Sequence, residues 1–153
     1  MTRINTIDVK HLCDQHAQAE YRELPMVMGS LKRSLKSKTP EEILPNIPPN
    51  YTLNKGHVTF HYNKGLYLQR RYNELIEELK DRGYDIDPKS RNITGFDIFP
   101  ELFQNEWWPN VADHQVNIER IILRIADKPQ WYKMHGETID FDAYQKLLSH
   151  HYS

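Results

Sequence analysis

Residues 15–38 read QHAQAEYRELPMVMGSLKRSLKSK, and their apolar side chains recur at a spacing of three or four positions. This spacing is typical of one face of a helix that packs on a core. The face consists of Leu24, Val27, Met28, Leu31 and Leu35. We predict a long helix over residues 8–37, interrupted by a kink at Pro25, because proline cannot donate a hydrogen bond to the preceding turn.

Two further helices are predicted from the same periodicity. Residues 66–82 place Leu68, Tyr72, Leu75 and Leu79 on one face, and Gly83 is well suited to end that helix. Residues 111–127 direct an isoleucine stripe toward the core, made of Ile118, Ile121, Ile122 and Ile125. The outward stripe of this helix consists of Asn117, Arg120, Arg124 and Lys128. It is either a phosphate track or a solvated face paired with nearby acids, and Pro129 ends the helix.

The segments between these helices are rich in proline and aromatic residues. Residues 39–42 read TPEE, a capping box with proline at the first helical position, which predicts a short helical turn. Residues 51–62 alternate between apolar and polar side chains, a pattern typical of a hairpin. In the connection 84–109, Trp107 and Trp108 are predicted to pin the chain to the core.

Length and composition indicate one compact domain. The chain has 153 residues, and apolar residues at 39% are enough to fill a single core. We assign residues 1–153 to this domain, with 137–153 as a short amphipathic C-terminal extension to which no function is assigned. The sequence shows no membrane span, and its single cysteine, Cys13, excludes a disulfide within the chain. Both points suit a cytoplasmic protein, and we expect a monomer.

The formal net charge of −1 hides a polarised distribution. Residues 1–38 hold seven Lys and Arg against four Asp and Glu, whereas residues 39–109 hold eight against eleven. A near-neutral protein with such a distribution can bind nucleic acid through one face. The basic side chains at the end of the first predicted helix are Lys32, Arg33, Lys36 and Lys38. They are either phosphate ligands or a solvated face near the helix C-terminus.

Metal chemistry is not predicted. His57 and His61 are four residues apart, but the intervening Val-Thr-Phe favours extended chain, in which such residues lie about 13 Å apart. A cysteine pair is absent and no carboxylate completes a ligand set. The sequence also lacks a glycine-rich phosphate loop, which argues against nucleoside triphosphate chemistry.

The first residues offer a different chemistry. Thr2 has a small side chain, so removal of Met1 would leave a free amine on Thr2. An α-amine has a pKa of about 7.7–8.0, so roughly a tenth of it is unprotonated and nucleophilic at pH 7. Every chain has such an amine, so on this ground alone an ordinary frayed terminus is the alternative.

Five motifs in order tie this terminus to a family. They are MTRIN at 1–5, DQH at 14–16, AEYRELP at 19–25, GHVTFHY at 56–62 and PQWYK at 129–133. In these motifs the chain resembles the bacteriophage pyrimidine-dimer DNA glycosylases of the endonuclease V type. The resemblance implies an all-helical fold in which residues 51–62 are mostly irregular. We therefore predict an all-α, single compact domain of about three main helices with long irregular connections.

The resemblance also implies a mechanism. The amine of Thr2 would attack C1′ of the 5′ nucleotide of a cyclobutane pyrimidine dimer, form an imine, and break the strand by β-elimination. Glu23 would stabilise the cationic intermediate and assist proton removal. The substrate would be double-stranded DNA with pyrimidine dimers or abasic sites, and no cofactor is needed. The alternative is a non-catalytic DNA-binding module that keeps the fold.

The DNA contacts implied by the resemblance are Arg3, Gln15, His16, Arg22, Arg120, Arg124, Trp131, Tyr132 and Lys133. Three positions depart from the family pattern. Met26 stands where an arginine is expected, and Met134 and His135 replace aromatic residues.

Overall fold

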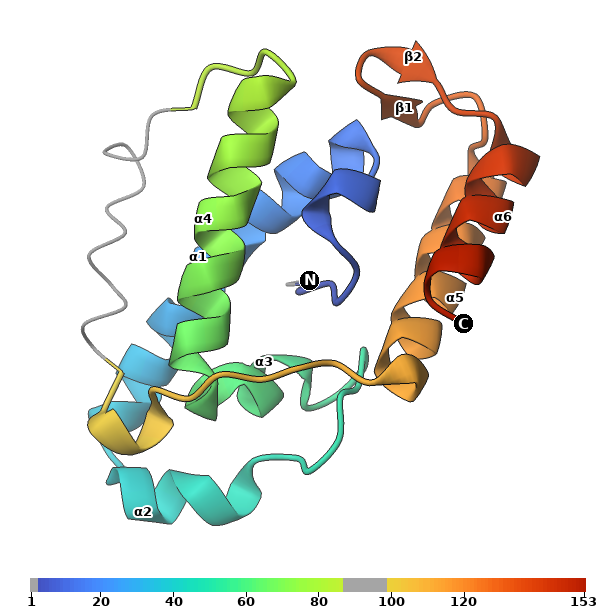
Figure 1. Ribbon diagram of the computed structural model, residues 1–153. Coiled ribbons are helices and arrows are strands. Elements are labelled where there is room, and N and C mark those ends of the chain that lie inside the picture. Colours follow the sequence, from blue (N-terminus) through green and yellow to red (C-terminus); the bar gives the residue numbers. More distant parts are fainter. Residues whose placement is uncertain (1–2, 87–98) are drawn as a thin grey trace.

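The computed structural model describes residues 3–86 and 99–153, and it confirms an all-α fold. Four helices carry most of the structure: α1 (Asp14–Leu35), α4 (Gly65–Asp81), α5 (Val111–Asp127) and α6 (Phe141–His151). The shorter helices are α2 (Pro40–Ile43) and α3 (His57–Phe60), with 3-10 turns at Val9–His11, Leu44–Asn46, His61–Asn63 and Glu101–Phe103. In Figure 1, α1 and α4 form one side of the molecule, α5 and α6 form the other, and the segment that starts at Arg3 lies between them.

Helix α1 begins later than predicted. The side chain of Asp8 accepts a hydrogen bond from the Lys10 amide and caps a separate 3-10 turn over Val9–His11. Leu12 and Cys13 are then extended, and α1 starts at Asp14. The helix is assigned without a break through Pro25, at which a kink was predicted, and it continues to Leu35. The apolar stripe from Leu24 to Leu31 is buried as predicted.

Helices α4 and α5 confirm the predicted periodicity, with one exception. Gly65, the first residue of α4, packs directly against the ring of Phe99. A Cβ atom at this position would lie 2.9 Å from that ring, so a larger residue would require the ring to move. Asn110 and Asp113 form a capping box at the start of α5. Asn117 was predicted to face outward, but it is 1% exposed. Its side chain lies among polar groups of the N-terminal segment and not in solvent.

Residues 51–56 are irregular and residues 57–63 fold into short helical turns. The hairpin that the alternating pattern suggested is therefore absent from these residues, and the extended conformation predicted between His57 and His61 is wrong. Gly56 adopts a left-handed conformation (φ 95°), which lets the chain turn directly into α3. The rings of His57 and His61 are consequently 5.0 Å apart between centroids. The alternating side chains instead build a small aromatic cluster that contains Tyr51 and Phe60.

The two adjacent tryptophans have different environments. Trp107 stacks on Tyr51 with ring centroids 5.7 Å apart, and it packs against the core as predicted. Trp108 does not: it is 71% exposed, and the guanidinium of Arg70 lies 4.6 Å from its ring centroid. The prediction for Trp108 was wrong because adjacent residues of a non-helical segment point to opposite sides.

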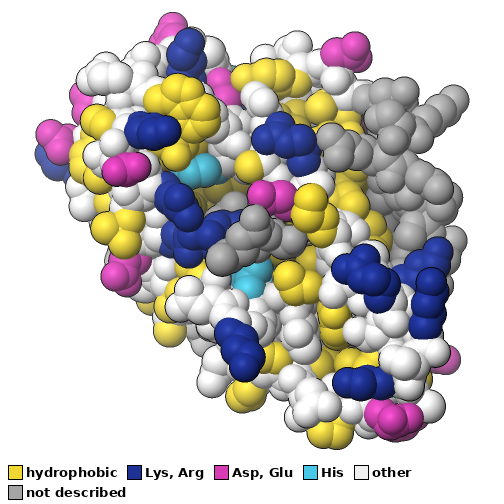
Figure 2. Space-filling view, turned by 180° about the vertical axis from the view of Figure 1, so that it is seen from behind, with side chains coloured by type: hydrophobic (Ala, Val, Ile, Leu, Met, Phe, Trp, Pro, Cys, Tyr) yellow, Lys and Arg dark blue, Asp and Glu magenta, His cyan; other side chains and the backbone are white. Residues whose placement is uncertain are grey.

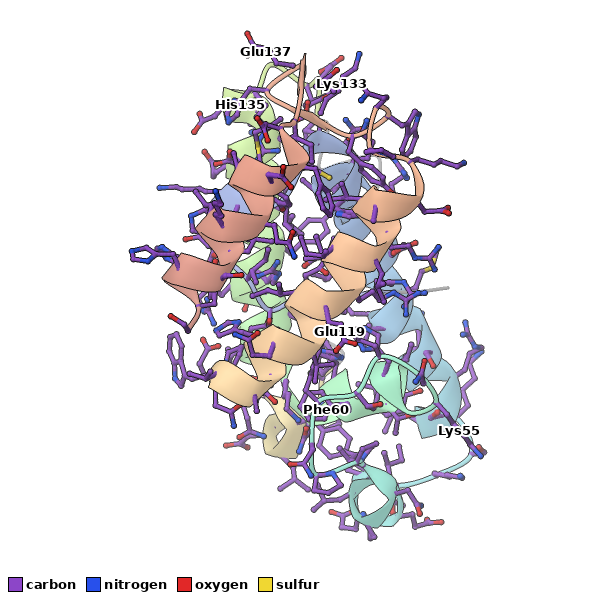
Figure 3. All side chains as sticks on the ribbon, turned by 90° about the vertical axis from the view of Figure 1, so that its right-hand side faces the viewer. Lys55, Phe60, Glu119, Lys133, His135 and Glu137 are labelled. Atoms are coloured by element: carbon purple, nitrogen blue, oxygen red, sulfur yellow. The ribbon has the colours of Figure 1, made fainter. Side chains whose placement is uncertain are left out.

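A hairpin that was not predicted joins the end of α5 to the C-terminal extension. Strands β1 (Lys133–Met134) and β2 (Glu137–Thr138) pair antiparallel around His135 (φ 51°) and Gly136 (φ 81°). Two successive positive φ values are typical of the tight turns that join paired strands. Figure 3 shows Lys133, His135 and Glu137 together at one end of the molecule, away from Lys55 and Phe60.

Helix α6 packs on α5 and on the start of the chain. Its Tyr144 hydroxyl donates to the His11 carbonyl, and the hydroxyl of Tyr152 accepts from the Asp8 amide. Among residues 3–86 and 99–153, none of the helices combines the length and the apolar character required to cross a membrane.

Candidate active site

The first described residues form an extended segment in which six consecutive amides donate to side chains and not to backbone carbonyls. The contacts are Arg3 N to Glu23 Oε2 (3.1 Å), Ile4 N to His57 Nε2 (2.8 Å), Asn5 N to Glu20 Oε1 (3.2 Å), Thr6 N and Ile7 N to Asn117 Oδ1 (2.8 and 3.4 Å), and Asp8 N to Tyr152 Oη (2.8 Å). Acceptors from α1, α3, α5 and the end of α6 thus replace a partner strand.

The carbonyl groups of this segment are held in the same way. The hydroxyls of Tyr51 and Tyr67 donate to the carbonyls of Ile4 (2.7 Å) and Asn5 (2.9 Å). Ile4, Asn5, Thr6 and Ile7 are all buried. A buried segment with satisfied polar groups has one defined conformation, so the start of the chain is fixed relative to α1.

Two carboxylates on α1 contact this segment, and their surroundings differ. Glu20 is 1% exposed and forms an ion pair with Arg71 while it accepts from both the amide and the side chain of Asn5. Glu23 is half-buried and accepts from the Arg3 amide through Oε2. Burial raises the pKa of Glu23 above the ordinary carboxyl value. Glu20 is therefore a structural ion, and Glu23 is the carboxylate available to a ligand.

A pocket of about 360 Å³ opens beside Glu23. Its walls come from the N-terminal segment, α1, α5 and the residues after α5. The lining residues are Arg3, Asn5, Gln15, His16, Gln18, Ala19, Glu20, Arg22, Glu23, Arg120, Ile121, Arg124, Trp131 and Tyr132. A pocket of this size, with several polar groups directed into it, is typical of a ligand site.

Arginines give the pocket its charge. Within the described part of the chain, Arg3 Nη1 and Arg120 Nε are buried and lack hydrogen-bond partners. Burial and the neighbouring charge of Arg124 lower the pKa of Arg120. A buried guanidinium nitrogen without a hydrogen-bond partner is costly, so this arrangement favours an anionic ligand that would pair with these two arginines. On the face shown in Figure 2, Lys and Arg side chains gather near the centre and again at the lower right.

His16 adds a neutral polar group. Its ring lies 5.0 Å from that of Tyr132, and burial together with the charge of Arg124 lowers its pKa to about 4. The imidazole is therefore uncharged at neutral pH. Its Nδ1 has no partner among residues 3–86 and 99–153, so it is free to bond a ligand.

The segment after α5 is attached to the start of α1. The Gln15 side chain donates to the Trp131 carbonyl (2.7 Å) and accepts from the Lys133 amide (3.0 Å). The Asp14 carboxylate accepts from the amides of His135 (3.0 Å) and Gly136 (2.9 Å).

Arg82, just beyond α4, completes this attachment with an ion pair to Asp14 (3.0 Å). Although burial opposes ionisation, the bonds from Gly136, His135 and Arg82 lower the pKa of Asp14. The hairpin is thus held by a charged acceptor, and Trp131 is placed at the pocket wall with 56% of its surface exposed.

The structure brings together most of the residues expected to contact DNA. Nine of the predicted site residues line the one pocket: Arg3, Gln15, His16, Arg22, Glu23, Arg120, Arg124, Trp131 and Tyr132. Lys133 is exposed and lies outside the lining, although its amide bonds Gln15. Thr2 lies outside the described residues. Lys32, Arg33, Lys36 and Lys38 are exposed, and none forms an ion pair within the described part of the chain.

Two residues that hold the N-terminal segment were missed. From the sequence His57 is a candidate only as a metal ligand, yet both of its ring nitrogens are bonded, one to Ile4 and one to Thr52. Asn117 had been placed on the outer face of α5. A signal existed for Asn117, since it lies four residues before the buried Ile121. In residues 3–86 and 99–153 no three His, Cys, Asp or Glu side chains converge as a metal site would require.

Comparison with known families gives one match. A family model described as pyrimidine dimer DNA glycosylase matches residues 1–92. That region contains the N-terminal segment, α1 and α4, and hence Glu23 and the residues that position it. Arg120, Arg124 and Trp131 lie beyond the matched region. The fold brings these three residues to the pocket that Glu23 also lines.

Proposed function

The chain belongs to the pyrimidine dimer DNA glycosylase family, and we propose that it excises cyclobutane pyrimidine dimers with the Thr2 amine as nucleophile and then nicks the strand. The observation that carries the proposal is the Glu23 carboxylate bonded to the Arg3 amide at the edge of an arginine-lined pocket. Residue 2 is joined to Arg3 by one peptide bond, so the proposed amine and carboxylate belong to one site.

The chemistry proceeds in two stages. The unprotonated amine attacks C1′ of the 5′ nucleotide, and the bond from C1′ to the base breaks. The displaced base takes up a proton and stays joined to the 3′ base through the cyclobutane ring. The sugar ring opens to a protonated imine. Removal of a proton from C2′ then expels the 3′ phosphate, and hydrolysis of the imine releases the enzyme.

Glu23 suits both stages. Its negative charge stabilises the cation that develops at C1′, and its raised pKa makes it a better proton acceptor than an ordinary carboxylate. The reaction as proposed requires neither a metal nor an organic cofactor.

The pocket supplies recognition. Arg3, Arg22, Arg120 and Arg124 surround the space with positive charge suited to the phosphates of a duplex. A glycosylase must also expose an atom that is hidden in the base stack, usually by extruding a nucleotide. The exposed indole of Trp131 and the neutral imidazole of His16 provide a stacking surface and a hydrogen-bonding group for a distorted site.

Borohydride trapping tests the proposal. Protein whose Met1 has been removed, as checked by mass spectrometry, is incubated with a duplex that contains one abasic site and is then reduced. We expect a covalent complex in which the modified peptide begins at Thr2. The control is protein acetylated at the N-terminus, which should not be trapped. Trapping by the acetylated protein would move the chemistry to a lysine, and no trapping by the processed protein would favour a non-catalytic DNA-binding module.

A further inference from the structure

Several side chains from outside α1 bond the N-terminal segment. Of these, His57 bonds the backbone amide that is closest in sequence to Thr2, the proposed nucleophile. It is 3% exposed, and its Nε2 lies 2.8 Å from the Ile4 amide while its Nδ1 lies 2.7 Å from the Thr52 carbonyl. An amide can only donate and a carbonyl can only accept. The ring must therefore be neutral, with its proton on Nδ1 and its lone pair on Nε2.

The other contacts of the segment show why this bond is distinctive. The neighbouring amides of Arg3 and Asn5 are bound by Glu23 and Glu20, both on α1. The Ile4 amide lies between them and is bound from α3. Among the acceptors of the amides of residues 3–5, which are the three nearest to Thr2, only His57 lies outside α1, and this second direction of attachment fixes the orientation of the backbone there. The Tyr51 hydroxyl, on the Ile4 carbonyl, reinforces the same residue.

We propose that His57 is a positioning residue for the amine: the lone pair on Nε2 fixes the Ile4 amide and, through the two preceding residues, the approach of the Thr2 amine to C1′ beside Glu23. This inference rests on the proposed function. It assigns His57 no contact with the substrate, since the ring is buried and outside the pocket lining.

The charged and titratable groups around His57 do not favour its protonation strongly. Glu20 on α1 attracts a proton to the ring, while Tyr51 and His61 contact it edge-on at 5.6 and 5.0 Å between centroids. Lys64 and Arg71 act on the adjacent His61, whose own pKa burial holds well below its usual range. Burial outweighs the Thr52 bond and Glu20, so the pKa of His57 lies below its ordinary value.

Protonation would disrupt this arrangement. A proton on Nε2 would point at the Ile4 N–H, so the acceptor would be lost and two donors would face each other. The amine also loses reactivity in acid, because it becomes fully protonated. The effect of His57 is separated from that of the amine by comparing variants that differ only at position 57.

Two substitutions separate the lone pair from the ring. In His57→Gln, the amide oxygen can accept from Ile4 near the position of Nε2, but the side chain does not titrate. In His57→Phe, the ring volume remains and the acceptor is lost. His61→Phe is the matched control, because His61 is an equally buried ring whose Nδ1 bonds the His57 carbonyl and whose Nε2 has no hydrogen-bond partner among residues 3–86 and 99–153.

The readouts are the single-turnover rate of borohydride trapping on abasic duplex, the Kd for that duplex, and the melting temperature, from about pH 5 to 8. We expect His57→Phe to trap about tenfold more slowly or worse with nearly unchanged Kd, since small misplacements of reacting groups are costly. His57→Gln should keep most of the rate at pH 8 and lose less of it in acid than the wild type. His61→Phe should lose melting temperature without a matching loss of rate.

Some outcomes would overturn the inference. One is wild-type trapping by folded His57→Phe, and another is an equal loss of rate in His57→Gln and His57→Phe at pH 8. If His57→Phe does not fold, the acid profile of His57→Gln decides, and a profile identical to the wild type would refute the role. Absence of trapping by the processed wild type overturns the proposed function itself, which is a distinct result.

Discussion

Glu20 and Glu23 lie one helical turn apart on α1, and both accept amides of the same N-terminal segment, from Asn5 and Arg3 respectively. Only Glu20 is also bound to the buried Arg71. Two acids of one motif thus have separate roles, one in the fold and one at the pocket. This division leads directly to a paired test.

Glu23→Gln should retain the fold and the affinity for DNA. Its rate of glycosidic-bond cleavage should fall by about 10²-fold or more, because the charge that offsets the developing cation is removed. Glu20→Gln should instead destabilise the protein by about 3–5 kcal/mol, since it leaves Arg71 buried without its counter-ion. The melting temperature measures the effect of Glu20→Gln, and the single-turnover rate of glycosidic-bond cleavage measures that of Glu23→Gln. Unchanged turnover in Glu23→Gln would refute its assigned role.

Arg120→Ala and Arg124→Ala should each weaken binding to damaged and undamaged duplex alike, because phosphate contacts position a protein without reading the bases. Each should also flatten the slope of log affinity against log salt concentration by about one unit. Lys146→Ala on α6, an exposed cation outside the pocket, is the control and should leave the slope unchanged. Slopes equal to the wild type in both arginine variants would show that these two side chains are solvated and do not contact phosphates.

Trp131→Ala should lower the preference for dimer-containing DNA by about 1–3 kcal/mol, the usual value of a base–aromatic contact. Trp131 is 56% exposed, so its loss should change the melting temperature little. Trp108→Ala removes a second exposed indole that is outside the pocket, and it should leave the ratio of damaged to undamaged affinity unaltered. A similar change in that ratio for both variants would contradict a specific role for Trp131.

Asp14→Asn should loosen the hairpin that follows Trp131. The carboxylate accepts from two amides and from Arg82, and an amide side chain would turn one of its two acceptors into a donor. We expect a cost of about 1–3 kcal/mol in stability and a loss of dimer preference similar to that of Trp131→Ala. Hydrogen exchange of the His135 and Gly136 amides would report the loosening. Unchanged protection of these amides would argue against this attachment.

Periodicity in the sequence predicted the parts of the fold that depend on local packing. The stripe from Leu24 to Leu31 is buried, as are Ile118, Ile121 and Ile125 of α5, because a helix repeats its faces every three or four residues. The tight turn after α4 also follows from a local requirement, the positive φ of Gly83.

The candidate site was predictable from short motifs, but its assembly was not. The motif residues from Arg3 to Glu23 and from Arg120 to Tyr132 meet at one pocket across more than a hundred positions of sequence. His57 and Tyr152 hold the N-terminal segment through contacts with no local pattern, so periodicity carries no information about them, whereas the burial of Asn117 follows from its place four residues before Ile121. The alternation in residues 51–62 misled for the same reason, because it reflects a tertiary aromatic cluster and not a strand.

The six amide contacts of residues 3–8 also set an order of events during synthesis. Their acceptors lie 15 to 144 positions away in the sequence, and the last is Tyr152. Ribosomes make the six donors first, the acceptors Glu20, Glu23 and His57 next, and Asn117 and Tyr152 much later. The complete set of six contacts can therefore form only after translation has reached Tyr152, so the segment that organises the site is among the first parts made and receives its last anchor late.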